Sequence, residues 1–274
     1  MKILLFLVLF INTLFANEKI IALSPSINEI IYALDAGDKI VGNTDFCNYP
    51  KDSLTKTKVG GYFSPNIEKI ISLKPDIVIM LASSQKLSKK LNTLGIKTKI
   101  LKLTTLEDIK RSIYTIGEIL DKKQKANKIV QDIDKKLNSI KNIVTNKKIL
   151  IVIGHNTSLV KRIFVVGDNL YLNDIINTSG NKNAFFSKRK GQPILNMENI
   201  IATNPDIVIT LSPYRKKKNL TKQELINPWL RLPISAAKTK SIYVIDKEYA
   251  GISSHRITYF LDDIKRILVD ARDK

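Results

Sequence analysis

Short runs of β-branched apolar residues alternate with amphipathic patterns along most of the chain. Residues 19–24 (KIIALS) predict a strand, and residues 26–34 predict a helix that begins with a capping box of Ser26 and Glu29. The alternation continues with strands over 39–44, 76–80, 97–103, 147–154, 206–210 and 241–246, and helices over 66–73, 87–95, 106–120, 170–180, 196–204 and 254–270. This rhythm predicts mainly parallel sheets with helices packed on them, which is an α/β fold.

One long helical pattern interrupts the alternation near the middle of the chain. It runs from about Lys122 to Val144, and its apolar residues recur every three or four positions between Ile129 and Ile140. The sequence therefore predicts two α/β lobes, residues 17–121 and 147–274, joined by one long helix at 122–146 with a ligand cleft between the lobes.

The two predicted lobes share a repeated sequence. Residues 66–80 read NIEKIISLKPDIVIM and residues 196–210 read NMENIIATNPDIVIT, with nine of the fifteen positions identical. A helix followed by Pro-Asp and a strand is common in βαβ units, so a single copy would be weak evidence for any particular fold. Two such copies, each followed by a loop that begins in Ala or Ser, predict a structural duplication of the lobe.

The amino terminus has the pattern of a secretory signal peptide. Met1-Lys2 precedes the apolar run ILLFLVLFINTLF, and the small residue Ala16 precedes polar sequence. We predict a signal peptide at residues 1–16 and a soluble mature chain in the periplasm. Cys47 is the only cysteine and lies far from the predicted cleavage site, which excludes an intramolecular disulfide and argues against a lipid anchor at the mature amino terminus.

The formal net charge of +20 raises the possibility of a nucleic-acid partner. The excess is almost all lysine, is spread through helices and loops, and lacks the interleaved aromatic residues that stack on bases. We therefore predict a solvated basic surface and no nucleic-acid partner. The clusters KRK at 188–190 and RKKK at 215–218 are denser, and they could face an acidic ligand or partner.

Ligands of parallel α/β sheets bind beyond the carboxyl ends of the strands. The segments at these positions are richer in Ser, Asn, Tyr and His than the rest of the chain. From them we select these candidate ligand contacts: Ser24, Pro25, Ser83, His155, Tyr214 and Tyr249. We add Tyr62, which lies shortly before the first repeated helix.

Signatures of catalysis are scarce. The chain contains neither a G-x-S-x-G nor a G-x-x-x-x-G-K-[ST] motif, and His155 and His255 are not spaced as H-E-x-x-H. A metal-dependent enzyme with a site between the lobes stays open as a second function class, with His155, His255 and Tyr249 as its candidates. Because clear third and fourth ligands are missing, we predict no catalytic residue, no metal site and no cofactor.

Three stretches carry a family resemblance: ALSPSINEIIYAL, VGNTDFCNYP and KVGGYFSPNIEKIISLKPDIVI, together with the second copy NMENIIATNPDIVI. They resemble the periplasmic substrate-binding proteins of iron-siderophore, haem and vitamin B12 ABC importers, and most closely the vitamin B12-binding branch. The resemblance implies two lobes that hold the ligand between them, one long connecting helix and a small hinge movement.

The resemblance also implies residue roles. Tyr62 and Tyr249 align with aromatic residues that stack on the ligand, and Arg256 follows a loop that often supplies a cleft residue. Glu68 and Glu198 match the glutamates, one in each lobe, that dock onto arginines of the membrane permease.

We therefore expect a monomeric binding protein, not an enzyme, that delivers a corrinoid or metal chelate to an ABC importer in the inner membrane. Haem or a ferric siderophore is the alternative ligand, because tyrosine can ligate haem or iron directly.

Overall fold

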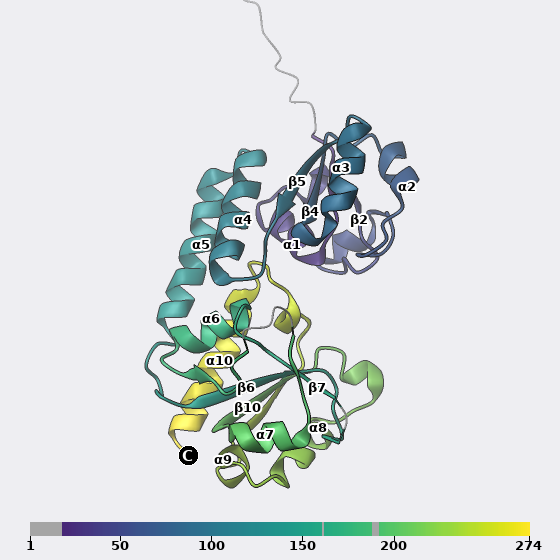
Figure 1. The fold of residues 1–274 in the computed structure, drawn as a ribbon. Helices are drawn as coiled ribbons and strands as arrows, with labels where there is room; N and C mark the ends of the chain where they lie inside the picture. The colour runs from purple at the N-terminus through teal and green to yellow at the C-terminus, as the bar shows by residue number, and fades with distance from the viewer. Residues whose placement is uncertain (1–17, 161, 188–191) are drawn as a thin grey trace, which may run out of the picture.

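The computed structural model describes residues 18–160, 162–187 and 192–274. The predicted signal peptide and the KRK cluster at 188–190 lie outside these residues. Figure 1 shows two lobes, one formed by the first third of the chain and the other by the second half, with a pair of helices lying along their side. Two α/β lobes confirm the predicted fold class.

The amino-terminal lobe is built on a five-stranded sheet. Its strands are β1 (Ile20–Ala22), β2 (Ile40–Asn43), β3 (Thr57–Lys58), β4 (Ile77–Leu81) and β5 (Lys97–Leu101). They lie in the order β3-β2-β1-β4-β5, and every pairing is parallel. Helix α1 (Pro25–Ala33) covers one face, and α2 (Ile67–Ser72) and α3 (Gln85–Thr93) cover the other.

Period-two alternation within the strands explains this layering. In β4, Ile79 packs into the same cluster as α1, whereas Val78 and Met80 pack with Ile70 of α2 and Leu91 of α3. Successive side chains of a strand point to opposite faces, so a strand that is apolar throughout is buried on both sides.

The carboxyl-terminal lobe has a mixed sheet. Its strands are β6 (Lys148–Ile153), β7 (Ile163–Val165), β8 (Lys182–Asn183), β9 (Ile194–Leu195), β10 (Ile207–Leu211) and β11 (Ile242–Ile245). The order is β11-β10-β6-β7-β9, with β8 also paired to β6. The pairs β6–β7 and β7–β9 are antiparallel and the others are parallel.

Five helices pack around this second sheet: α6 (Tyr171–Thr178), α7 (Met197–Thr203), α8 (Lys222–Leu230), α9 (Ser235–Lys238) and α10 (Ile257–Arg272). Short 3-10 segments lie at Gly37–Lys39, Lys51–Leu54, Ala82–Ser84, Lys216–Lys218 and Glu248–Gly251. None of the helices in the described part of the chain is long and apolar enough to cross a membrane.

Helices α4 (Leu106–Ile119) and α5 (Lys123–Asn138) form an antiparallel pair beside the lobes. Helix α5 is shorter than predicted and ends at Asn138 rather than near Val144. The helical pattern is broken there because Asn142 adopts φ 55° and donates its backbone N–H to the Ser179 carbonyl. A contact with α6's carboxyl end thus replaces the last predicted turns.

The repeated sequence forms the same helix–strand structure in both lobes. Asn66 and Asn196 cap α2 and α7 by accepting the backbone N–H three residues later. In the first copy, Asp76 Oδ2 accepts the backbone N–H of Lys19 at 2.7 Å, beside β1. In the second, Asp206 Oδ2 accepts the backbone N–H of Lys148 at 2.8 Å, at the start of β6. The Pro-Asp pair therefore fixes one strand against its neighbour in each lobe.

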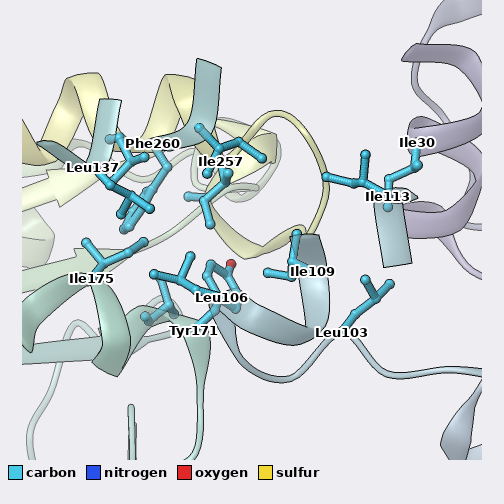
Figure 2. Close-up of a cluster of buried hydrophobic side chains, with 14 of the residues drawn as sticks. Ile30, Leu103, Leu106, Ile109, Ile113, Leu137, Tyr171, Ile175, Ile257 and Phe260 are labelled. Atoms are coloured by element: carbon cyan, nitrogen blue, oxygen red, sulfur yellow. The ribbon is translucent and has the colours of Figure 1, made fainter. Parts of the chain in front are cut away.

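A single buried cluster extends through both lobes. Figure 2 shows α4 in its middle, with Ile113 beside Ile30 of α1 at one end and Leu106 near Tyr171 of α6 at the other. The lobes are therefore joined by a continuous apolar core as well as by the chain.

Candidate functional site

A pocket of the amino-terminal lobe lies between the loop that leads into α2 and the residues that follow β4. It is a cavity of about 640 Å³, lined by Tyr62, Phe63, Ser64, Pro65, Ile67, Ala82, Ser83, Ser84, Gln85, Lys86, Leu87 and Lys90. The hydroxyls of Tyr62 and Ser83 lie 3.1 Å apart, so two residues predicted as ligand contacts meet here. Phe63 stands edge-on to Tyr62, with ring centroids 4.7 Å apart, and is 91% exposed. Tyr62 and Phe63 therefore present two aromatic rings to the cavity.

The loop that carries Tyr62 is shaped by its backbone. Gly60 has φ 99°, a region that favours glycine, and pairs with Pro65 as an isolated antiparallel bridge. A Cβ at Gly60 would lie 3.2 Å from the Asn66 backbone nitrogen, so the tight approach also requires glycine. The bridge turns Tyr62 and Phe63 towards the end of β4.

Ser24 and Pro25 lie at the start of α1. Ser24 is the residue before the helix and is almost fully buried, and its carbonyl accepts the Asn28 N–H at 3.0 Å. Pro25 is the first helical residue, where its missing N–H costs nothing. The structure thus gives both residues a clear part in starting the helix.

The carboxyl ends of β6 and β10 lie side by side, because the Gly154 N–H donates to the Leu211 carbonyl at 3.0 Å. His155 follows β6; burial, and then the nearby Lys218, lower its pKa. Tyr214 follows β10 and is 40% exposed, with Lys217 Nζ 5.0 Å from its ring centroid. These strand ends therefore bring two predicted ligand residues together with a cluster of lysines.

In the part of the chain that the structure describes, four residues at the same strand ends have buried polar atoms without a partner, and His155 is the one among them that was predicted as a ligand contact. Within the described residues, His155 Nε2, Asn156 Nδ2, Thr210 Oγ1 and Ser212 Oγ are buried without a hydrogen-bond partner. Buried polar atoms are normally paired with protein or water, so these atoms leave hydrogen-bonding capacity at the strand ends. The serine in LSPY was the sequence signal that pointed to one of them.

Tyr249 lies in the 3-10 segment before α10. Its hydroxyl donates to Asp263 Oδ2 at 2.6 Å, and its ring centroid is 5.7 Å from that of Tyr259. Burial and the Asp263 carboxylate raise the pKa of this phenol well above its usual value. The hydroxyl is therefore held protonated by α10, although the ring remains half-buried.

Arg256 is buried and ion-paired. Its Nε donates to Glu29 Oε2 at 3.0 Å, a second guanidinium nitrogen contacts Glu29 Oε1, and the guanidinium lies 3.8 Å from the Tyr49 ring centroid. Both charged side chains are nearly inaccessible, at 6% and 2%. Any contact between Arg256 and a ligand would have to break this pair.

The predicted capping box of Ser26 and Glu29 is wrong, because Glu29 has other partners. Ser26 and Glu29 do not cap α1; instead Glu29 Oε2 accepts the Ser254 hydroxyl at 2.5 Å, and Ser26 Oγ lies 3.1 Å from Ser253 Oγ. The residues before α10 are therefore bonded across the lobes to α1. Sequence spacing alone favoured the local partner because the true one is more than 220 positions away.

Glu68 and Glu198 occupy equivalent positions, each two residues after the asparagine cap of its helix. Both side chains are exposed. Neither has an ion pair within residues 18–160, 162–187 and 192–274. Each lobe therefore presents one free carboxylate in the first turn of a repeated helix.

Cys47, the single cysteine of the sequence, has ordinary surroundings. Cys47 is buried, its sulfur lies 3.2 Å from Thr44 Oγ1, and burial raises the pKa of its thiol. In the described part of the chain, no group of three or more His, Cys, Asp or Glu residues is arranged to hold a metal ion.

Comparison with known proteins gives consistent matches. A family model described as periplasmic binding protein matches residues 20–249. The vitamin B12-binding protein of Vibrio parahaemolyticus is 38% identical over 114 residues, which is 39% of this chain and 42% of the relative. The alignments span less than half the length of the first curated relatives.

Solved structures match over nearly the whole chain. The periplasmic vitamin B12 binding protein BtuF of Vibrio cholerae has a TM-score of 0.77 at 20% identity, covering 94% of this chain and 98% of that one. The periplasmic heme binding protein HutB of Vibrio cholerae has a TM-score of 0.76 at 22% identity, covering 92% and 98%. At these identities the likeness concerns the fold.

Proposed function

The chain belongs to the periplasmic binding protein family, and from this premise we propose that it captures a small-molecule ligand between its lobes and delivers it to an ABC importer. The ligand is a corrinoid or a metal chelate, with haem or a ferric siderophore as the alternative. The protein acts as a monomer in the periplasm and presents its loaded form to a permease in the inner membrane. Residues 17–121 and 147–274 serve as the two lobes, and 122–146 joins them.

The amino-terminal cavity is the observation that supports capture most strongly. It combines an aromatic wall of Tyr62 and Phe63 with the hydroxyl of Ser83, at the strand end where ligands of α/β sheets bind. His155 and Tyr214 supply the corresponding surface of the other lobe. Ser24, Pro25, Tyr249 and Arg256 belong to the proposed ligand contacts as well; they lie at the start of α1 and in the residues that lead into α10.

A titration with a panel of ligands tests this function. The purified mature chain is titrated with cyanocobalamin, haemin, several ferric siderophores and free divalent metals, and thermal shift and absorbance are recorded. Saturable binding of one member of the first three groups supports the carrier function. Tight binding of a bare metal together with turnover of a substrate would contradict it in favour of an enzyme.

The two free carboxylates support docking to the permease. Glu68 and Glu198 stand at equivalent places in the two lobes, so a partner with two basic sites would contact both lobes at once. A local role also exists, because a carboxylate in the first turn favours its own helix through the dipole. The two roles are compatible.

We expect Glu68→Ala and Glu198→Ala each to leave ligand affinity within about twofold of wild type and to reduce uptake by reconstituted importer several-fold, about the effect of losing one charged contact. Glu107→Ala, which removes an exposed carboxylate of α4, is the matched control and should leave uptake unchanged. Loss of ligand binding in either variant would show that the glutamate belongs to the ligand site instead.

A further inference from the structure

Two lysines of α3 stand on the wall of the amino-terminal cavity. Lys86 and Lys90 both line it, and their spacing of four residues places them on the same face of the helix, one turn apart. Lys89 belongs to the same helix and is also exposed, but it is not part of the lining. Of these three lysines, only Lys86 and Lys90 therefore line the cavity.

These two charges are not neutralised by the surrounding protein. The lining of the cavity contains no aspartate or glutamate. In the part of the chain that the structure describes, neither Lys86 nor Lys90 forms an ion pair. Residues 85–102 hold six lysines and no acidic residue, so neighbouring sequence offers no counter-ion either.

Like charges one helical turn apart repel each other and destabilise the helix that carries them. A solvated lysine face is the ordinary explanation in a chain with this composition, and it accounts for Lys89. It does not account for two cations beside Tyr62, Phe63 and Ser83, because these residues form the surface on which a ligand would lie. An anion bound there would relieve the repulsion.

The carboxyl-terminal lobe also carries positive charge at its strand ends. Lys218 lies close enough to His155 to lower the pKa of the imidazole further, and Lys217 lies over the ring of Tyr214. Each lobe thus combines aromatic rings with lysines at the place where its strands end. A ligand that contacted both would meet positive charge from two sides.

We propose that the ligand is an anionic metal chelate that carries an aromatic or conjugated ring, whose acidic oxygens bind Lys86 and Lys90 while the ring packs against Tyr62 and Phe63. This inference rests on the proposed function and narrows it, because a corrinoid whose side chains are neutral amides lacks a pair of such groups. Carboxylate and catecholate oxygens both supply the required charge.

The test compares three probes with four forms of the protein. Wild type, Lys86→Gln/Lys90→Gln, Lys86→Glu/Lys90→Glu and the control Lys89→Gln are titrated with haemin, a ferric tricatecholate and cyanocobalamin, at low and high salt. We expect wild type to bind one of the two anionic probes, with an affinity that falls as salt rises. The double Gln variant should bind about tenfold more weakly and the double Glu variant more weakly still, whereas Lys89→Gln should stay within about twofold.

The outcomes separate the two proposals. An anionic probe that binds all four forms equally, or cyanocobalamin as the probe that wild type binds, would overturn the anionic assignment and leave the carrier function standing. Binding of none of the probes by a folded wild type would count against both. Thermal unfolding of each variant shows whether a weak result reflects a lost charge or an unfolded chain.

Discussion

His255 occupies a position where a proton on its imidazole is unfavourable. Burial, and then the adjacent Arg256, lower its pKa from 6.5 to about 4. Its Nδ1 is buried, and no hydrogen-bond partner for it lies within the described residues. Because the residue stands beside the pair that joins the two lobes, its protonation would place a second cation next to Arg256.

This environment predicts acid sensitivity. Between pH 6.5 and about 4 the unfolded chain holds a proton on this histidine that the native state lacks, so native stability falls as the pH falls through this range. The shift corresponds to at most about 3 kcal/mol, and solvent access to the side chain reduces it. Denaturant unfolding at pH 7 and pH 4.5 measures the loss.

The carboxylates of the protein also titrate in this range, so a comparison isolates the histidine. His255→Gln, which stays neutral, should lose less stability than wild type between the two pH values. His155→Gln is the matched control at a less buried histidine. Equal losses in wild type and His255→Gln would show that His255 is not the acid-sensitive group.

Helices α4 and α5 approach each other more closely than most side chains allow. Gly117 lies in the last turn of α4, and a Cβ built there would come within 2.5 Å of the Ala126 Cβ in α5. Glycine weakens a helix interior, so its presence in α4 is explained by this contact and not by helix propensity.

We expect Gly117→Ala to destabilise the protein by about 1–3 kcal/mol, because the clash between the new Cβ and the Ala126 Cβ outweighs the gain in helix propensity. Urea unfolding followed by circular dichroism measures the change. Ala126→Gly added to Gly117→Ala removes the clash and should restore most of the loss. A stabilising effect of Gly117→Ala alone would mean that the helices can separate without cost.

Elements with a clear period were predictable and short or irregular ones were not. The repeated helix–strand units α2–β4 and α7–β10 were predicted at nearly their observed bounds. Strands β7 and β9 were missed because they are three and two residues long and depend on antiparallel pairing with each other. Helix α8 was missed because Pro228 lies inside it, and its neighbour α9 has only four residues.

At the scale of the whole molecule, two kinds of contact hold the lobes together. The apolar cluster around α4 reaches from α1 to α6 and α10. The pair of Glu29 and Arg256, supported by the hydroxyl of Ser254, ties α1 to the start of α10. The lobes are therefore held together by this apolar cluster and by a buried ion pair between the first α-helix and the start of the last one.

Removing one partner of this buried pair should be costly. Glu29→Ala leaves the Arg256 guanidinium buried without its counter-ion, and we expect a loss of about 3–5 kcal/mol in the free energy of unfolding. Guanidinium-induced unfolding followed by fluorescence measures it. Glu29→Leu combined with Arg256→Met should recover much of the loss, because neither charge then remains buried.

The outcome also tests coupling between the lobes. If the pair joins them, the unfolding transition of Glu29→Ala should broaden or divide in two, whereas that of Asp45→Ala, an exposed carboxylate in the same lobe, should keep the wild-type shape. A small loss with an unchanged transition would show that the apolar cluster alone joins the lobes.

The sequence by itself determined the α/β rhythm, the duplication at 66–80 and 196–210, and the family, because these depend on local periodicity and on motifs read along the chain. It also identified Tyr62 and Ser83, which meet in one cavity because both lie near the end of β4. Tertiary structure alone decided the partner of Glu29, the proton held by Tyr249 and the cavity that separates Lys86 and Lys90 from Lys89. These features arise between residues distant in sequence or from the direction in which a side chain points, and neither is written in the spacing of residue types.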